Sequence, residues 1–184
     1  MYYSLVHFPD IDRTKINEFR AKYDPYFNLI NAHISIVFPV PDAVGKEKLI
    51  KHIENKLLTQ KPFDIHISGL EKAWDNWLFL VLKEGRGEIV KLHDILYEDI
   101  LSEFLRKDIE FIPHIAIGLF TEKDGNYDLK DPKIVPLDDV LYKRALLEAE
   151  NSAFDFTSKV TKLSLVEIDD NFTRTTVVKE FQLQ

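Results

Sequence analysis

The feature that most constrains the fold of this chain is a short apolar strand pattern that occurs twice, each time with one histidine at the same place. The first copy covers residues 31–38 (NAHISIVF) and the second covers residues 112–120 (IPHIAIGLF). Side chains alternate between the two faces of a strand, so His33 and His114 each point away from the aliphatic residues that we expect in the core. The repeat therefore predicts one site that is built by two related strands.

The two histidines are candidates for an acid–base pair. An imidazole changes its protonation near neutral pH, so one ring can take a proton from an attacking hydroxyl or water while the other gives one to a leaving oxygen. Neither spacing nor composition says which histidine is the base. The alternative is that each lies by chance on a solvated strand face, as a single copy would suggest. Because the pattern is repeated, we expect His33 and His114 to face one cleft.

Hydrophobic periodicity predicts alternating strands and helices along the 184 residues. We expect strands at 2–8, 29–40, 63–70, 77–82, 112–120, 159–168 and 175–183, and helices at 10–23, 49–58, 89–104 and 138–151. The helix at 89–104 is expected to be the longest, and residues 71–76 to connect two strands as a hairpin. Strand–helix–strand–helix order in each half predicts an α+β fold. Residues 1–184 are then expected to form a single domain of two pseudo-symmetric lobes.

Composition indicates a globular, cytoplasmic protein. Hydrophobic residues make up 45% of the chain and charged residues 30%, and there is no cysteine for a disulfide, a thiolate nucleophile or a cysteine-based metal site. We find neither a signal-peptide pattern nor an apolar stretch of membrane-spanning length. The net charge of −7 disfavours long duplex nucleic acid and fits a small nucleotide or an RNA terminus. We expect no metal and no cofactor, and the oligomeric state stays open.

The histidine motifs and the beginning of the chain resemble a known family. A His-x-Ser or His-x-Thr motif that occurs twice, each time on an apolar strand, resembles the 2H phosphoesterase superfamily, which includes 2′-5′ RNA ligases and cyclic phosphodiesterases. Residues 1–9 (MYYSLVHFP) and 19–30 (FRAKYDPYFNLI) resemble the opening of the YjcG-like phosphoesterases. The order of elements matches over nearly the whole chain. The resemblance implies two antiparallel sheets that form a central groove, with helices outside.

The two copies differ two residues after the histidine. Ser35 shares the face of His33, about 6.5–7 Å further along the strand, where its hydroxyl can donate to a phosphoryl oxygen. The resemblance implies that this hydroxyl binds phosphate. Ala116 stands at the matching position of the second copy, where the family carries Ser or Thr. Loss of one such donor typically costs roughly 10²–10³ in rate. Ala116 therefore predicts a weakened enzyme, a site in which a backbone amide, a lysine or a bound water substitutes for the hydroxyl, or a protein that only binds its ligand.

Two further residues are candidates for the substrate groove. His66 belongs to a third His-x-Ser, and we favour a solvated strand face for it over a role in the groove because the family motif has no counterpart there. Trp74, in the expected hairpin connection, is a candidate for stacking a base, although a core or surface aromatic is the usual alternative. His7, His52 and His93 are expected to be structural or solvated. No basic residue can be placed in the groove from the sequence.

Two functions are compatible with these residues. The first is a metal-independent phosphoesterase that hydrolyses a 2′,3′-cyclic phosphate, a 2′-5′ linkage or a related small phosphodiester, with His33 and His114 as the catalytic pair. The second is a weakly active or inactive module that binds nucleotides or RNA ends in the same groove. The two histidines favour the enzyme, and Ala116 keeps the binding module open.

Overall fold

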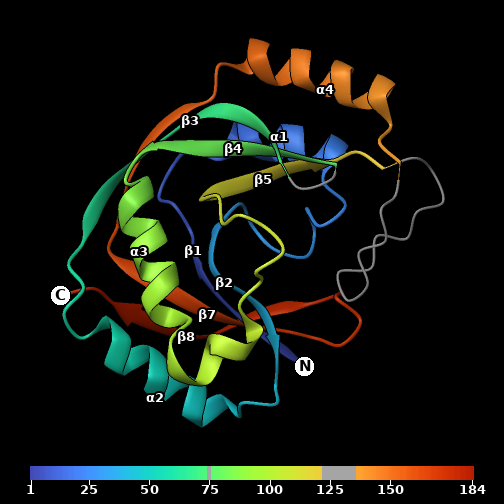
Figure 1. Cartoon of the computed structure of the whole chain (residues 1–184). Coiled ribbons are helices and arrows are strands. Elements are labelled where there is room, and N and C mark those ends of the chain that lie inside the picture. The colour runs from blue at the N-terminus through green and yellow to red at the C-terminus, as the bar shows by residue number, and fades with distance from the viewer. Residues whose placement is uncertain (74–75, 122–135) are drawn as a thin grey trace.

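The computed structural model describes residues 1–73, 76–121 and 136–184, which form two antiparallel sheets with helices around them (Figure 1). The strands are β1 (Tyr2–His7), β2 (Ile34–Pro41), β3 (Phe63–Ala73), β4 (Trp77–Glu84), β5 (His114–Leu119), β6 (Asp155–Val160), β7 (Lys162–Ile168) and β8 (Thr175–Gln182). The helices are α1 (Thr14–Tyr23), α2 (Lys46–Leu57), α3 (Arg86–Leu96), α4 (Asp139–Ser152) and the short 3-10 helix η1 (Asp99–Phe104).

The two sheets have matching arrangements around the histidine strands. The strand order is β2-β1-β7-β8 in one sheet and β5-β4-β3-β6 in the other, so β2 and β5 are both edge strands. Each edge strand pairs with the strand that precedes it in the chain, β1 or β4, and a helix, α1 or α3, lies between the two in sequence. The predicted α+β class, with two antiparallel sheets around a groove, is confirmed.

Each of these helices packs against the edge strand of the other sheet, α1 against β5 and α3 against β2. Ile34 and Ile36 of β2 are fully buried in the same apolar core as Ile115 and Ile117 of β5. His93 of α3 adds a polar link, because its Nδ1 donates to the carbonyl oxygen of Ile36 at 2.8 Å. With the aliphatic faces of both edge strands in the core, their other faces are left for the space between the sheets.

The prediction of one long helix over residues 89–104 is wrong, because the structure divides this segment into two helices. The structure ends α3 at Leu96 and continues as η1, so the described helix with the most residues is α4, with 14. Asp99, the first residue of η1, has a φ of +54°, a left-handed conformation that does not continue an α-helix. The apolar stripe continues through this break because η1 still packs Leu101 into the core. Periodicity therefore identifies the buried face of α3, but neither the interruption nor the buried residue of η1.

Three strand predictions also need correction. The first histidine strand starts at Ile34 rather than 29, so His33 immediately precedes β2. The strand β3 extends to Ala73, which shortens the expected connection at 71–76. The strand β6 was not predicted, because four of its six residues are polar and Val160 alone among them is buried. The helix predicted at 138–151 is capped at its start by Asp138, whose carboxylate accepts a hydrogen bond from the backbone N–H of Leu141 at 2.9 Å.

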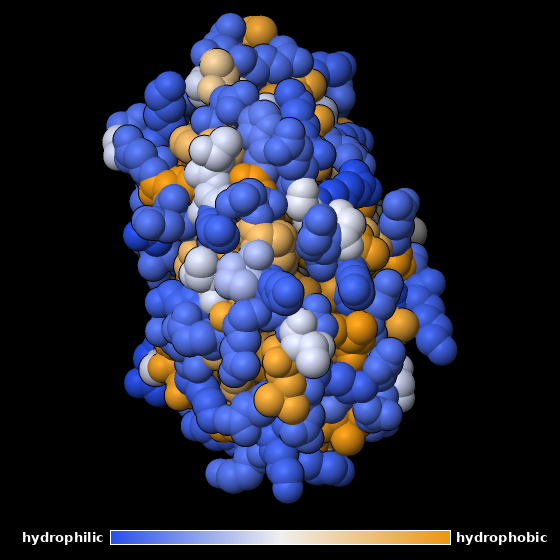
Figure 2. All heavy atoms as spheres, turned by 90° about the vertical axis from the view of Figure 1, so that its left-hand side faces the viewer, coloured by the Kyte–Doolittle hydropathy of each residue, from blue (hydrophilic) through white to orange (hydrophobic). Residues whose placement is uncertain are grey.

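The face of the molecule shown in Figure 2 is mostly hydrophilic. The hydrophobic side chains on this face form separate spots. Of the large apolar residues that are most exposed in the described chain, Val140 and Leu147 lie on α4, Val177 lies on β8 and Leu58 directly follows α2. Such scattered residues are normal on a protein surface. None of the described helices is long and apolar enough to span a bilayer.

Candidate active site

A cavity of about 730 Å³ lies between the two sheets and is lined by both histidines. Ser35 and Ala116 line the same cavity, so the structure brings together both copies of the repeated motif. The catalytic roles of His33 and His114 stay a prediction. The other described residues of the wall come from both sheets and from the loops beside them: Tyr2, Ser4, Arg20, Asp24, Tyr26, Leu29, Ile30, Phe38, Pro39, Trp77, Phe79, Phe104, Arg106, Asp108, Ile109, Ile168, Phe172 and Thr175.

Each imidazole is oriented by the same local hydrogen bond. Nδ1 of His33 donates to the carbonyl oxygen of Asn31 at 2.8 Å, and Nδ1 of His114 donates to the carbonyl oxygen of Ile112. A carbonyl can only accept, so Nδ1 carries the proton in both rings. In the neutral ring Nε2 therefore holds the lone pair, which is the form that a general base requires. The repeat thus extends from the sequence to the tautomer of the two side chains.

Both histidines are held in the neutral form. Burial lowers the pKa of His33 to about 4, and the positive charge of Arg20 acts in the same direction. Burial lowers the pKa of His114 to about 3, and the neighbouring His33 adds to this effect. At pH 7 neither ring of the free protein is charged. A bound phosphate would favour the protonated form, because an opposite charge nearby raises the pKa of a histidine.

An aromatic row supports the second histidine. The ring of His114 stacks on Phe79 with a centroid distance of 3.4 Å and an interplanar angle of 13°. Phe79 lies next to Trp77, and Trp77 stacks against Tyr26 with centroids 6.1 Å apart. Phe79 and Trp77 are themselves buried, so they fix the ring plane of His114 and form the floor of the cavity. Tyr26 is half-buried and lies at the end of this row.

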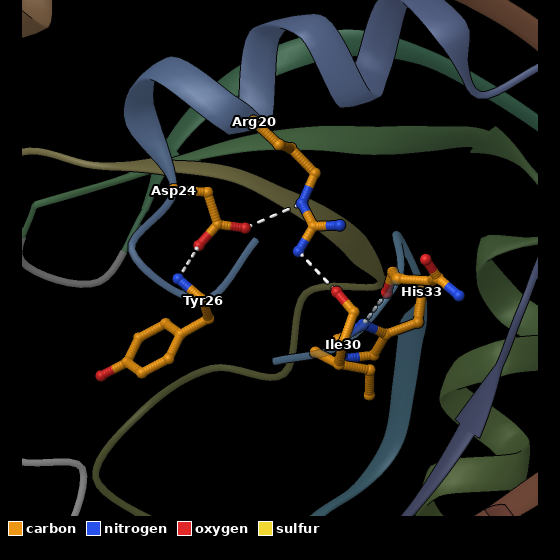
Figure 3. A network of polar contacts seen from close by, with 6 residues as sticks. Arg20, Asp24, Tyr26, Ile30 and His33 are labelled. Atoms are coloured by element: carbon orange, nitrogen blue, oxygen red, sulfur yellow. Dashed lines mark hydrogen bonds and ion pairs between the residues drawn. The ribbon is translucent and has the colours of Figure 1, made fainter. Parts of the chain in front are cut away.

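A buried ion pair organises the segment before His33. Nε of Arg20 donates to Oδ2 of Asp24 at 2.7 Å, and Nη2 of Arg20 donates to the carbonyl oxygen of Ile30 at 2.9 Å (Figure 3). Oδ1 of Asp24 accepts a hydrogen bond from the backbone N–H of Tyr26 at 2.9 Å. The side chains of Arg20 and Asp24 are each 2% exposed. Together these bonds hold the turns between α1 and β2 in place and so position His33.

Arg20 is a cavity residue that the sequence did not reveal. We expected no basic residue to be placeable in the groove, yet Arg20 and Arg106 both line it. The spacing of Arg20 and Asp24, four residues apart at the end of a helix, is a signal for an ion pair but not for its burial. Burial depends on α1 packing against β5, a tertiary contact between segments far apart in sequence.

Each arginine in the wall has an aspartate partner. Arg106 forms a bidentate ion pair with Asp108: Nε donates to Oδ1 at 2.7 Å, and Nη2 donates to Oδ2 at 2.5 Å. Arg20 is paired with Asp24 in the same way, although by one bond. With both histidines neutral, the described wall carries no net formal charge, whereas the whole chain carries −7. The cavity is therefore a weakly polar site in an acidic protein.

The remaining candidates lie elsewhere. His66 is not among the described residues that line the cavity; its Nε2 is 2.9 Å from Oδ1 of Asp155, and Ser68 donates to the other carboxylate oxygen at 3.4 Å. A role for His66 in this cavity is therefore not supported. Trp74 falls outside the described residues. Three other histidines are buried and bonded to backbone carbonyls: His7, His52 and His93. Within the described ranges, no three His, Cys, Asp or Glu side chains form a group that could hold a metal ion.

Comparison with known proteins identifies the family. The sequence profile of the 2′-5′ RNA ligase superfamily matches residues 8–171. The chain belongs to this superfamily. Relatives include a Bacillus licheniformis protein that carries the name putative phosphoesterase, with 25% identity over 134 residues that cover 70% of this chain and 77% of the relative.

Solved structures of the superfamily type share the fold. A Thermus thermophilus protein superposes with a TM-score of 0.61 and 16% identity, covering 100% of this chain and 98% of its own. Escherichia coli LigT, crystallised with NADP+, superposes with a TM-score of 0.58 and 18% identity, covering 99% of this chain and 96% of LigT. At these identities the likeness shows the fold alone. It extends over the whole chain, as the predicted order of elements implied.

Proposed function

We propose that the protein is a metal-independent phosphoesterase that hydrolyses a small phosphodiester, such as a 2′,3′-cyclic phosphate or a 2′-5′ linkage, by acid–base catalysis with His33 and His114. The observation that carries the proposal is that both rings line one cavity, and both have Nδ1 bonded to a backbone carbonyl. In this proposal the two Nε2 atoms are the groups that exchange protons. Membership of the superfamily supports a phosphoesterase or ligase type of reaction.

The reaction requires one neutral and one protonated ring. Nε2 of the neutral histidine takes a proton from water as the water oxygen forms a bond to phosphorus. The bond from phosphorus to the ribose oxygen breaks, and that oxygen takes the proton from Nε2 of the other histidine. Because both pKa values are low in the free protein, the phosphate group of the substrate has to promote protonation of one ring. The hydroxyl of Ser35 donates a hydrogen bond to a phosphoryl oxygen.

The cavity supports a small substrate of low charge. A volume of about 730 Å³ is within the range of about 300–1,000 Å³ that is usual for small-molecule sites. A wall without net charge favours a phosphodiester, with one negative charge, over a phosphomonoester with two. Escherichia coli LigT has been crystallised with NADP+, ATP and phosphate, which supports a nucleotide as the ligand class for this fold. We therefore assign a nucleotide or an RNA end to the cavity.

The test is turnover of a defined panel by purified, EDTA-treated protein. The panel contains nucleoside 2′,3′-cyclic phosphates, 2′-5′ dinucleotides, 3′-5′ dinucleotides and RNAs with a cyclic terminus. We expect the protein to hydrolyse nucleoside 2′,3′-cyclic phosphates, 2′-5′ dinucleotides or RNAs with a cyclic terminus. This activity should not depend on added divalent metal. Binding of these compounds without any turnover would favour the binding module, which Ala116 supports. Activity that appears only with added metal would contradict the proposal.

A further inference from the structure

The two halves of the cavity are unequal in hydrogen-bond donors. Ser35 and Ala116 both line the cavity at the position two residues after a histidine. Ser35 brings a hydroxyl to the first half, whereas Ala116 brings only a methyl group to the second. A phosphoryl group has several oxygens that need donors when it leaves water. A donor from another part of the wall is therefore needed beside β5.

Arg20 has such a donor that is not used. The guanidinium has five N–H groups; Nε is bonded to Asp24 and Nη2 to Ile30, but Nη1 is buried and has no hydrogen-bond partner among the described residues. Buried polar groups in proteins are nearly always paired, so an unpaired nitrogen of a charged side chain indicates a partner that comes from outside the chain. The side chain as a whole is 2% exposed.

The position of Arg20 matches the place where the donor is missing. Arg20 lies on α1, which packs against β5, the strand that carries Ala116. In Figure 3 the guanidinium nitrogen without a dashed line points away from Asp24. Arg20 lines the cavity together with Ala116, and its charge acts on His33. One guanidinium is thus close to the second strand and to the first histidine.

We propose that Nη1 of Arg20 donates to a phosphoryl oxygen of the ligand and takes the place of the hydroxyl that Ala116 lacks. This inference rests on the proposed function, in that it assigns a phosphate group to the cavity. A charge-assisted hydrogen bond from a guanidinium is stronger than one from a hydroxyl, so the exchange keeps the site functional. Because Nη1 is buried in the unliganded protein, this bond requires a local rearrangement of the wall when the ligand binds.

The test compares two ligands that differ only in the phosphate. The probes are adenosine 3′-monophosphate at pH 5.5, where the phosphate carries about one charge, and adenosine, with affinities measured by calorimetry. We expect Arg20→Gln to weaken binding of the nucleotide by about 10- to 100-fold, as for a lost bond to a charged group, and to leave adenosine unchanged. Ala116→Ser in the Arg20→Gln protein should restore much of the loss.

Asp24→Asn is the matched control for a purely structural role of Arg20. It breaks the ion pair that organises the segment before His33 but keeps the guanidinium. We expect this variant to retain the preference for the nucleotide over adenosine. The proposal is overturned if Asp24→Asn loses that preference as Arg20→Gln does, if Ala116→Ser gives no rescue, or if the unaltered protein binds both ligands equally.

A second test does not depend on the folding of the Arg20 variant. It measures the affinity of Ala116→Ser, in the otherwise unaltered chain, for the same nucleotide. Since Arg20 already supplies the donor, we expect the added hydroxyl to raise affinity for the nucleotide by less than threefold. A larger gain would show that the donor is missing and would overturn the proposal. These binding measurements are independent of turnover, so a catalytically inactive protein would contradict the proposed function without deciding the role of Arg20.

Discussion

Two histidines that are 81 positions apart share the same local hydrogen bond and the same tautomer. Both donate from Nδ1 to the carbonyl oxygen two residues earlier, and burial lowers the pKa of both. The hydrogen bond fixes which nitrogen meets the ligand, and burial fixes the charge of the free site. The sequence predicted the pair and the shared face, because alternation in a strand is a local property. It could not predict the low pKa values, because burial is set by Phe79 and the rest of the cavity wall.

The first prediction concerns stability and pH. The pKa of His114 is about 3 in the folded protein and near 6.5 when unfolded, so below pH 6.5 the unfolded state binds more protons and stability falls as the pH falls. Between pH 7 and pH 5 this one group should lower the free energy of unfolding by about 2 kcal/mol. Urea unfolding of the unaltered protein and of His114→Gln at both pH values measures the effect. Between pH 7 and pH 5, the free energy of unfolding of His114→Gln should fall by about 2 kcal/mol less than that of the unaltered protein. An equal fall in both proteins would contradict the assigned pKa.

The second prediction concerns the pH dependence of the rate. The active form has one charged ring, and in the free protein this form becomes scarce above the pKa of His33, about 4. The constant kcat/KM reports the free enzyme, whereas kcat reports the enzyme with substrate bound. As the pH rises, kcat/KM should therefore begin to fall at a lower pH than kcat. The bound phosphate raises the histidine pKa, so the kcat limb moves to higher pH. Coincident profiles for kcat and kcat/KM would count against this account.

At the scale of elements, the site depends on each helix packing against the other sheet's edge strand. The contact between α1 and β5 is close at Gly118, where an added Cβ would lie 2.6 Å from the Phe120 ring and 3.1 Å from Cβ of Tyr23. Phe120 is fully buried in the core. A larger residue would push β5, and with it His114, away from α1. Gly118 is thus a position where the fold sets the geometry of the site.

The third prediction follows from this contact. Gly118→Ala should lower the free energy of unfolding by about 1–3 kcal/mol through overpacking. Gly87→Ala is the control, because an added Cβ there meets nothing within 4 Å and the residue lies in α3, where alanine is preferred. Denaturant unfolding of both variants measures the difference. Equal stability of the two variants would mean that α1 and β5 are not in close contact at Gly118.

Elements with a strong local pattern were predictable, and those with tertiary causes were not. The apolar faces of β2 and β5 and the cap of α4 at Asp138 follow from neighbouring residues in the chain. The break between α3 and η1 depends on the left-handed conformation of Asp99, which no sequence pattern required. The strand β6 is stabilised by its pairing with β3, since its own residues are mostly polar and incompletely buried.

At the scale of the whole molecule, an acidic chain encloses a cavity whose wall has no net formal charge. The surface carries the excess of carboxylates, while Arg20 and Arg106 are each matched to one aspartate inside. The sequence predicted that a small site could exist within an acidic protein. It could not identify its cations, because Arg20 reaches the cavity only through the packing of α1. The ionic groups of the site were therefore found from the structure and the two histidines from the sequence.

The central claim is that His33 and His114 together perform the chemistry, and one experiment tests it directly. Turnover of a nucleoside 2′,3′-cyclic phosphate by EDTA-treated protein is compared among the unaltered chain, His33→Ala, His114→Ala and His66→Ala. Loss of either partner in proton transfer should lower kcat by roughly 10²–10⁴-fold without unfolding the protein. His66→Ala, which changes a histidine outside the cavity lining, should stay within about twofold. Full activity in either cavity variant, or an equal loss in all three, would contradict the account.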